Sequence, residues 1–410
     1  MSARRSHDEC SRTVPSRTSF RVVGLFAGIG GIEKGLAEAG HTAIRFCEFD
    51  PAARAVLAHH FALPIDADIT KIKNLPKSCD LVSAGFPCQD LSQVGRTSGF
   101  RGSQSSLVAH VFKLLRKRSV PWVLLENVPF MLHLHRGEAL HKIVKWLEEL
   151  GYRWAYRVID TRAFGLPQRR RRVFLVASLT GDPAAVLLAS DAGPVNEPSS
   201  RNGDACGFYW TEGNTGIGWA VGAIPPLKGG SQLGIPSPPA ILLPSGDIVT
   251  PNIRDAERLQ GFPSNWTLPA LDVKGVLPRH RWRLVGNAVT VNVARWIGER
   301  LAMHQELVHD PSNAILLRRR DRWPNAAFGH SGSRWAADVS EWPVRYRTKQ
   351  LVTFLRFKPT PLSHRAAAGF LRRAIASTLH LEPTFLIDLQ RHVANAAETT
   401  PETPNDDGIT

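Results

Sequence analysis

The feature that most constrains the fold is a regular alternation of short apolar segments and helical segments over the first 180 residues. Apolar runs at residues 20–26, 80–84 and 122–125 have the length of buried strands. Segments with helical spacing, such as residues 51–61 and 138–150, lie between or after them. Strands that alternate with helices of this length predict an α/β fold with a doubly wound, parallel sheet.

Composition changes after residue 180 and divides the chain further. Residues 181–247 are dense in Gly, Pro, Ser and Asn, which predicts an irregular region, and helical spacing returns near residue 252. The predicted parts are a disordered arm at 1–19, a first domain at 20–180, an irregular region at 181–250, a return segment at 251–305, an extension at 306–393 and a disordered tail at 394–410.

Charge and cysteine content limit the classes of partner and compartment. The 410 residues include 51 Lys and Arg against 36 Asp and Glu, a net charge of +15, and a polyanion is the natural partner of such a chain. Five cysteines without a C-x-x-C pair argue against a disulfide framework and indicate a reducing compartment. No apolar run approaches the roughly 20 residues of a membrane-spanning helix. The basic run at residues 318–322 suits either phosphate contacts or a packing appendage.

A glycine-rich turn at residues 28–31 follows the first predicted strand and opens a helix. Backbone N–H groups in such a turn lie close to a bound ligand. Glu48, at the end of the second predicted strand, is in the right place to hold ribose hydroxyls, and Phe49 can stack on a base. Glu33 stands where a dinucleotide-binding turn needs its third glycine, which disfavours a nicotinamide-dependent oxidoreductase. The pattern therefore predicts nucleoside binding.

Two residues after predicted strands have the chemistry of a reactive site. Cys88 follows Gly85 and Pro87 just past the third strand, where open α/β sheets bind ligands, so it is a candidate nucleophile. Glu126 ends the apolar strand at 122–125, where partial desolvation raises the pKa of a carboxyl group. The alternative for Cys88 is a small buried cysteine, and the alternatives for Glu126 are a helix N-cap or a salt-bridge partner.

Four consecutive arginines follow Gln168 and lead into another apolar strand. In an extended segment alternate side chains share a face, so Arg170 and Arg172 are predicted to point together with Gln168. Arg169 and Arg171 are predicted to point the other way. A solvated charged face is the alternative for such a run.

Six motifs in order make the chain closely resemble the cytosine-5 DNA methyltransferases. They are Phe26-x-Gly28-x-Gly30-Gly31, Gly85-Phe86-Pro87-Cys88-Gln89-x-x-Ser92, Glu126-Asn127-Val128, Gln168-x-Arg170-x-Arg172, Arg258-Leu259-Gln260-Gly261-Phe262-Pro263 and Gly286-Asn287-Ala288-Val289. The resemblance covers roughly residues 20–302. It implies a Rossmann-like methyltransferase sheet, a smaller target-recognition domain and a C-terminal extension.

The resemblance implies that Cys88 adds to C6 of a cytosine flipped out of duplex DNA. Glu126 then contacts N3 and the exocyclic amine, C5 takes the methyl group of S-adenosylmethionine, and Arg170 and Arg172 line the cytosine pocket. The residues that it assigns to S-adenosylmethionine are Phe26, Ala27, Gly28, Ile29, Gly30, Gly31, Glu48, Phe49, Asp68, Ile69, Gly85, Pro87, Leu107, Asn287 and Ala288. The stretch 103–108 departs from the family's usual pattern before Leu107.

The same resemblance suggests a setting for the activity. Residues 20–180 and 251–305 become the catalytic domain, and 181–250 the target-recognition region. The expected enzyme is a cytoplasmic monomer of a prokaryotic-type cell that binds duplex DNA, without a membrane or metal, either solitary or alongside a restriction endonuclease with which it forms no stable complex. An RNA cytosine-5 methyltransferase and an inactive DNA-binding regulator are the alternatives. A zinc site at His133, His135 and His141 lacks fitting spacing.

Overall fold

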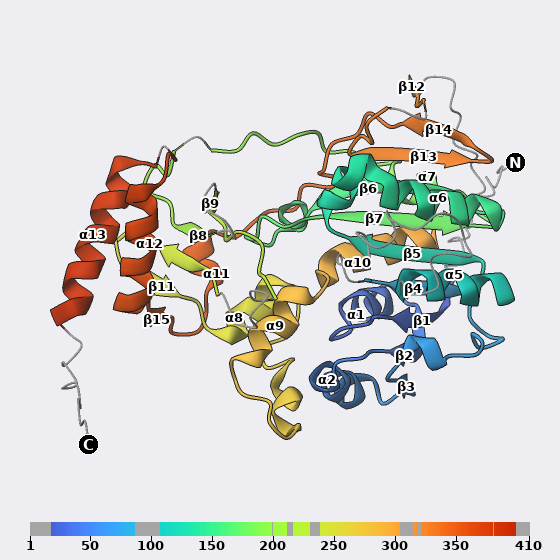
Figure 1. The fold of residues 1–410 in the computed structure, drawn as a ribbon, viewed down its shortest axis with the longest axis horizontal. Coiled ribbons are helices and arrows are strands. Elements are labelled where there is room, and N and C mark those ends of the chain that lie inside the picture. Colours follow the sequence, from blue (N-terminus) through green and yellow to red (C-terminus); the bar gives the residue numbers. More distant parts are fainter. Residues whose placement is uncertain are drawn as a thin grey trace, which may run out of the picture.

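The protein consists of a large domain and a small domain that lie side by side. The computed structural model describes residues 18–86, 107–198, 200–210, 216–229, 238–303, 315–318, 321–379 and 381–398. Figure 1 shows the large domain on the right, built around a wide sheet, and the small domain on the left, which ends in the helices α12 (His364–Ala376) and α13 (Pro383–Glu398). No described helix is long and apolar enough to span a bilayer.

The large sheet has the strand order β12-β14-β13-β6-β7-β5-β4-β1-β2-β3 among the described residues. Neighbouring strands from β3 to β5 are parallel, whereas all pairs from β5 to β12 are antiparallel. The strands are β1 (Arg21–Leu25), β2 (Thr42–Cys47), β3 (Ile65–Asp66), β4 (Leu81–Ala84), β5 (Trp122–Asn127), β6 (Arg153–Asp160), β7 (Arg171–Ser178), β12 (Ile315–Leu316), β13 (Ala326–His330) and β14 (Ser333–Ala336).

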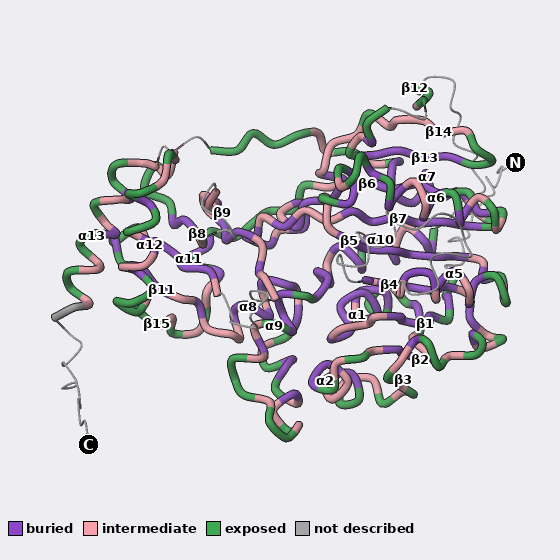
Figure 2. Tube along the Cα trace, in the orientation of Figure 1, coloured by how far each residue is buried: buried purple, intermediate pink, exposed green. Residues whose placement is uncertain are grey.

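Helices cover both faces of this sheet, as a doubly wound fold requires. On one face, Phe112 of α5 (Leu107–Lys117) and Ile143 of α6 (Glu138–Glu149) pack against the strands. On the other face, Leu36 of α1 (Gly31–Glu38) and Ile297 of α10 (Val291–Ala302) do so, together with α7 (Pro183–Leu187). The central strands β4 and β5 are buried along their whole length (Figure 2). The predicted α/β fold class is confirmed.

The antiparallel half of the sheet departs from the predicted parallel arrangement. No helical crossover joins β6 to β7; the connecting residues 161–170 turn the chain back, so that the two strands pair antiparallel from Arg153↔Ser178 to Asp160↔Arg171. The strands β13 and β14 then extend the sheet from the C-terminal part of the chain. The alternation of strands and helices in the first 180 residues could not predict that β13, far along the chain, pairs with β6.

The small domain contains a second, antiparallel sheet with the order β15-β11-β10-β8-β9. Its strands are β8 (Cys206–Trp210), β9 (Ile217–Val221), β10 (Ala240–Leu242), β11 (Ile248–Thr250) and β15 (Thr360–Pro361). The prediction of irregular structure for residues 181–247 is therefore incomplete, because three of these strands, β8, β9 and β10, lie in that range. They are short and separated by Gly- and Pro-rich segments, which hides their alternation.

The C-terminal residues are shared between the two domains. The range 306–393, predicted as a separate extension, supplies β13 and β14 to the large sheet and β15 and α12 to the small domain. Phe370 of α12 and Phe385 of α13 pack on Phe208 of β8. Helix α13 continues to Glu398, into the range 394–410 predicted as a tail, because Leu389 and Val393 extend its apolar face onto this core.

The remaining elements connect the two domains and surround their junction. They are α2 (Pro51–Phe61), α8 (Ile253–Leu259), α9 (His280–Asn287), α11 (Leu351–Phe354), and the 3-10 helices η1 (Ile69–Lys71), η2 (Pro129–Leu132), η3 (Leu134–Gly137), η4 (Thr161–Phe164) and η5 (Leu268–Asp272). Residues of α8, α9 and α11 share one buried cluster with β10 and β11. The return segment therefore packs against both domains.

The close packing of α1 on α10 yields a stability prediction. A Cβ atom on Gly35 would lie 2.5 Å from the carbonyl oxygen of Val291, so we expect Gly35→Ala to lower the free energy of unfolding by about 1–3 kcal/mol. Gly369 of α12 has open space around its Cα, so Gly369→Ala should be neutral or stabilise by up to about 1 kcal/mol. Urea unfolding followed by circular dichroism compares the two variants, and equal effects would contradict this packing.

Candidate active site

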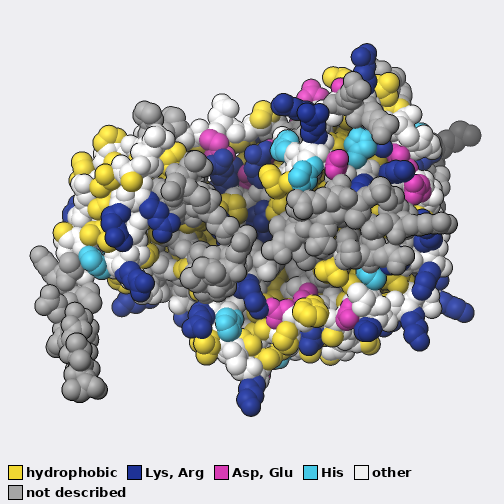
Figure 3. All heavy atoms as spheres, in the orientation of Figure 1, with side chains coloured by type: hydrophobic (Ala, Val, Ile, Leu, Met, Phe, Trp, Pro, Cys, Tyr) yellow, Lys and Arg dark blue, Asp and Glu magenta, His cyan; other side chains and the backbone are white. Residues whose placement is uncertain are grey.

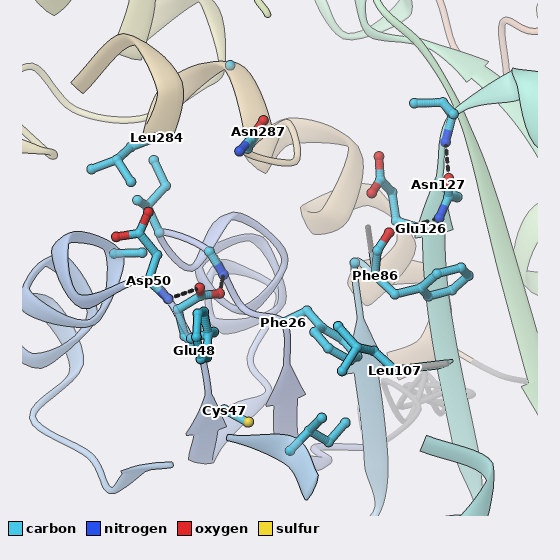
Figure 4. Close-up of a pocket in the computed structure, with 18 of the residues that line it drawn as sticks. Phe26, Cys47, Glu48, Asp50, Phe86, Leu107, Glu126, Asn127, Leu284 and Asn287 are labelled. Atoms are coloured by element: carbon cyan, nitrogen blue, oxygen red, sulfur yellow. Dashed lines mark hydrogen bonds between the residues drawn. The ribbon is translucent and has the colours of Figure 1, made fainter. Parts of the chain in front are cut away.

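A cavity of about 570 Å³ opens at the carboxyl ends of β1, β4 and β5 (Figure 4). This is the edge of a parallel sheet at which open α/β folds bind ligands. It is lined by Phe26, Gly28, Ile29, Cys47, Glu48, Phe49, Asp50, Ala53, Ala67, Asp68, Ile69, Gly85, Phe86, Leu107, Glu126, Asn127, Val128, Arg170, Arg172, Leu284, Gly286 and Asn287.

The turn between β1 and α1 forms one wall of the cavity. Phe26, Gly28 and Gly30 have φ values of 53°, 56° and 82°, a left-handed conformation that only glycine adopts without strain. Gly31 lies against the return segment, where a Cβ atom would be 2.2 Å from the carbonyl oxygen of Val289. The glycines are therefore needed both for the conformation of the turn and for the close approach of the turn to Val289 in the return segment.

Glu48 and Phe49 follow β2 on the opposite side of this turn. The Glu48 carboxylate accepts hydrogen bonds from the backbone N–H of Gly28 at 2.7 Å and of Asp50 at 2.8 Å. Burial nevertheless raises the pKa of Glu48, and the two backbone hydrogen bonds oppose that rise. The Phe49 side chain is 80% exposed at the rim. An exposed aromatic ring beside a fixed carboxylate suits a flat, hydroxylated ligand.

Asp68, Ile69 and Leu107 complete this part of the cavity. Asp68 caps η1, because its Oδ1 accepts a hydrogen bond from the Thr70 N–H at 2.8 Å. A hydrogen bond with the Thr70 side chain, followed by this backbone contact, lowers the pKa of Asp68 below its usual value. Leu107 is the first residue of α5 and lies near Phe26 in Figure 4. All three residues, which the resemblance assigns to S-adenosylmethionine, thus border the cavity.

Glu126 and Arg172 form an ion pair in the wall of the cavity. The antiparallel pairing of β5 with β7 places Glu126 opposite Phe174, two residues from Arg172. Arg172 Nε lies 3.2 Å from Glu126 Oε1, and Glu126 is only 8% exposed. Desolvation raises the pKa of Glu126, while the charges of Arg172 and Arg170 oppose the rise. The carboxyl group can therefore hold a proton closer to neutrality than an exposed glutamate.

Arg170 is buried at the junction of the two domains. Its guanidinium donates to the carbonyl oxygens of Leu227 at 3.0 Å, Gly286 at 3.2 Å and Ala288 at 2.8 Å. Its Nε has no hydrogen-bond partner within the described residues, and the side chain borders the cavity. Burial holds the pKa of Arg170 well below its usual range. Arg170 thus fastens two distant segments to β7 and leaves one donor unused.

The two faces of this arginine run are used as the alternation predicts. Gln168 is buried with Arg170, and its Oε1 accepts from the Leu227 N–H at 3.0 Å. Arg169 instead lies near Glu197, and Arg171 pairs with Glu341. The predicted separation of the run into an inward and an outward set is confirmed.

Asn127 and Asn287 position the edges of the cavity. Asn127 Nδ2 donates to the carbonyl oxygen of Phe86 at 2.9 Å, and its Oδ1 accepts from the Val128 N–H at 2.8 Å. Asn127 therefore fixes the residue that precedes the segment 87–106. Asn287 ends α9, and a Cβ atom on Gly229 would lie 2.1 Å from its Oδ1.

Most of the residues predicted from the sequence come together around this one cavity. Ala27, Gly30, Gly31 and Ala288 support its walls without bordering it. Pro87 and Cys88 lie outside the described residues. Several lining residues had no predicted role, although they lie within the motifs or within two residues of a predicted site residue or motif. They are Cys47, Asp50, Phe86, Asn127, Val128, Leu284 and Gly286.

The histidines considered as zinc ligands do not assemble. The described part of the chain contains no group of three or more His, Cys, Asp or Glu side chains placed to hold a metal ion. His141 Nε2 lies 2.7 Å from Arg334 Nη1, and its ring packs edge-on against Trp323. This histidine, a residue of α6, therefore has a packing role.

Comparison with known proteins identifies the family to which this site belongs. The family model "C-5 cytosine-specific DNA methylase" matches residues 20–202 and 250–303. The chain belongs to this family, and it is a DNA (cytosine-5-)-methyltransferase that uses S-adenosylmethionine as methyl donor. Residues 203–249 and those beyond 303, which build most of the small domain, fall outside the match.

Similar relatives are type II methyltransferases of bacteria. M2.BsuMI of Bacillus subtilis (strain 168) is 48% identical over 384 residues, which cover 91% of this chain and 98% of that protein. M.MspI of Moraxella sp is 27% identical over 316 residues, 72% of this chain and 73% of that protein. Among solved structures, the Entamoeba histolytica methyltransferase EhMeth has a TM-score of 0.49 at 15% identity, covering 70% of this chain and 98% of that one.

Glu33 explains physically why this glycine turn differs from a dinucleotide-binding one. Its side chain lies inside the large domain, where Oε1 accepts a hydrogen bond from Ser83 Oγ at 2.7 Å. A Cβ atom on Gly24 would lie 2.5 Å from the same oxygen. Oε2 has no hydrogen-bond partner among the described residues. Desolvation raises the pKa of Glu33 to about 7.

This buried acid predicts a pH-dependent stability. Because the pKa of Glu33 is higher in the folded protein than in the unfolded chain, its contribution is fully present at low pH and is lost as pH rises to about 7. Glu33→Gln stays neutral, so the variant should lose less stability than the wild type between about pH 5 and about pH 8. Urea unfolding at both pH values measures this, and identical pH dependence in the two proteins would contradict it.

Proposed function

We propose that the chain methylates C5 of a cytosine rotated out of duplex DNA, through a covalent bond between Cys88 and C6, with Glu126 as proton donor. The observation that carries this assignment of roles is the Glu126–Arg172 ion pair. It lies in the wall of the same cavity that Glu48 borders. A desolvated acid and a nucleoside-binding carboxylate thus face one space from its two ends.

The residues around the cavity fit S-adenosylmethionine. A volume of about 570 Å³ is within the usual range for small-molecule and cofactor sites. Glu48 is oriented by two backbone N–H groups and can accept hydrogen bonds from ribose hydroxyls, while Phe49 and Leu107 offer apolar surface to the adenine. The turn at Gly28 brings backbone to the methionine portion. When bound, the cofactor supplies an electrophilic methyl group.

The protein residues must make an unreactive cytosine ring nucleophilic. The Cys88 thiolate adds to C6, and the electron pair displaced toward N3 is neutralised by the proton of Glu126. Arg172 orients Glu126 at 3.2 Å, and Arg170 lines the same cavity. C5 then becomes the nucleophile. After methyl transfer leaves the demethylated cofactor, a water molecule accepts the C5 proton, N3 returns its proton to Glu126, and the Cys88 thiolate leaves C6, which restores the enzyme.

Target recognition is assigned to the small domain. Its sheet lies beside the arginine run, since Arg169 Nη1 donates to the carbonyl oxygen of Trp219 in β9 at 3.1 Å. The backbone of Leu227 is held by both Arg170 and Gln168. A cytosine in the cavity would therefore lie beside this domain, whose Gly-rich sequence suits contacts with base edges in a groove.

The biological setting follows from the relatives. Because they are named type II methyltransferases, we propose that the enzyme protects specific DNA sites in a bacterial cytoplasm, beside a separate restriction endonuclease. We further propose that it acts as a monomer, since one chain supplies both walls of the cavity. Bisulfite sequencing of DNA from cells that express the protein tests the activity and reads the target sequence together.

Replacing the nucleophile separates binding from chemistry. Cys88→Ser should abolish methyl transfer to duplex DNA, because a serine hydroxyl is a much weaker nucleophile than a thiolate. S-adenosylmethionine should still bind with wild-type affinity, as judged by isothermal titration calorimetry. Full methyl transfer in this variant would exclude the covalent route.

Replacing each carboxylate distinguishes its role. Glu126→Gln cannot donate a proton, so kcat should fall by roughly 10²- to 10⁴-fold with little change in S-adenosylmethionine affinity. Glu48→Gln is the matched control and should chiefly weaken cofactor binding. Single-turnover methylation and cofactor titration of both variants measure the two effects. A Glu126→Gln enzyme with wild-type kcat would remove Glu126 from the chemistry.

A further inference from the structure

A long stretch of the C-terminal region carries positive charge without any compensating acid. Between Glu341 and Glu382, residues 342–379, here called the basic segment, contain eight Lys and Arg and no Asp or Glu. These eight cations equal more than half of the chain's net charge of +15. They are Arg345, Arg347, Lys349, Arg356, Lys358, Arg365, Arg372 and Arg373.

All eight residues are exposed, and several have no carboxylate partner. The side chains of Arg347, Lys349, Arg356 and Lys358 pair with no acid within the described part of the chain. Other arginines of this protein do pair with acids, among them Arg162 with Glu197, Arg171 with Glu341, Arg283 with Asp50 and Arg295 with Glu299. Clustered cations that repel one another without local neutralisation are the electrostatic footprint of a polyanion site.

The basic segment is held firmly where it crosses from the large domain to the small one. Trp342 is buried in the core on the α1 and α10 side of the large sheet, and Leu351 and Phe354 are buried with α8 at the junction. Between them, the Tyr346 N–H donates to the carbonyl oxygen of Ala163 at 2.9 Å. The exposed cations therefore project from a fixed backbone, and Figure 3 shows Lys and Arg side chains that continue over α12.

This crossing contains a hollow with a distinctive lining. Arg347, Thr348, Lys349, Gln350 and Thr353 surround about 710 Å³. Two cations, two hydroxyl groups and an amide face the hollow, and no carboxylate does. Such a set matches the side chains that contact phosphate and sugar oxygens rather than base edges in protein–DNA complexes.

We propose that the basic segment binds the sugar–phosphate backbone of duplex DNA, with Arg347 and Lys349 as its principal phosphate contacts. The inference rests on the proposed action on duplex DNA and adds a surface outside the methylation site. The cavity lies near the junction where Arg170 binds Leu227, and the basic segment also crosses that junction, between Trp342 and Leu351. These contacts are independent of sequence, so they set the affinity and position of the DNA and leave base reading to the small domain.

The experiment measures how the affinity for DNA depends on salt. Binding of the full chain to a duplex of arbitrary sequence is titrated from low to physiological salt for the wild type and for the double variant Arg347→Gln/Lys349→Gln. Loss of two phosphate contacts should make the slope of log K against log salt less negative by about 2. Affinity at physiological salt should fall by roughly tenfold to thirtyfold. Arg347→Lys retains the charge and should retain the wild-type slope.

A matched control separates location from overall charge. Lys145→Gln/Arg153→Gln removes the same two charges; Lys145 lies on α6, and Arg153 lies at the end of β6 that is distant from Arg172. This variant should keep the wild-type slope. The proposal would be overturned by equal slopes in all proteins or by equal losses of DNA affinity in the two double variants. An RNA hairpin is titrated in parallel, and a loss of affinity seen only for this RNA would also overturn the proposal. Methylation of genomic DNA by the wild type is scored separately, so failure of the proposed function is distinguishable from failure of this one.

Discussion

The arrangement of the site depends on a single buried guanidinium. Arg170 would be very costly to bury without partners, and three carbonyl oxygens from two distant segments supply them. Those segments carry Leu227, which lies between β9 and β10 of the small domain, and residues 286–288, which close the cavity. Because Arg170 precedes β7, the same contact fixes the strand that presents Arg172 to Glu126. Domain placement and the reactive pair are therefore set by one constraint.

The alternation of side chains along one extended segment then divides four adjacent arginines between two tasks. Arg170 and Arg172 face the cavity, whereas Arg169 and Arg171 reach Glu197 and Glu341 on the outside. A run of like charges would otherwise repel itself. Here each member has its own acid or carbonyl partner, so the run is tolerated in a half-buried position. The local period of two was readable from the sequence, and it accounts for the success of that prediction.

What the sequence could not supply are the contacts between residues that are far apart along the chain. The longer helices and the parallel strands β1, β2, β4 and β5 of the first half follow local periodicity and were predicted almost to their ends, whereas the two-residue strand β3 was not predicted. The antiparallel β13, which pairs with β6 across more than 160 residues, has no local signature. Likewise, the partners of Arg170 lie 57 to 118 residues away. The motif resemblance located the candidate site because motifs encode such distant contacts indirectly.

The family match covers most of the large domain and leaves out most of the small domain. The matched residues, 20–202 and 250–303, contain the cavity, the reactive pair and the clamp formed by Arg170. The unmatched residues supply β8, β9 and β10, and later β15, α12 and α13, which pack into one core around Phe208. Two segments separated by the entire return segment thus fold as one domain. Since neither can bury its apolar face alone, changes in β8, β9 and β10 are constrained by packing against α12 and α13. The second segment also carries the exposed cations of the basic segment, so the part of the chain that completes this core is also the part proposed to hold the DNA backbone.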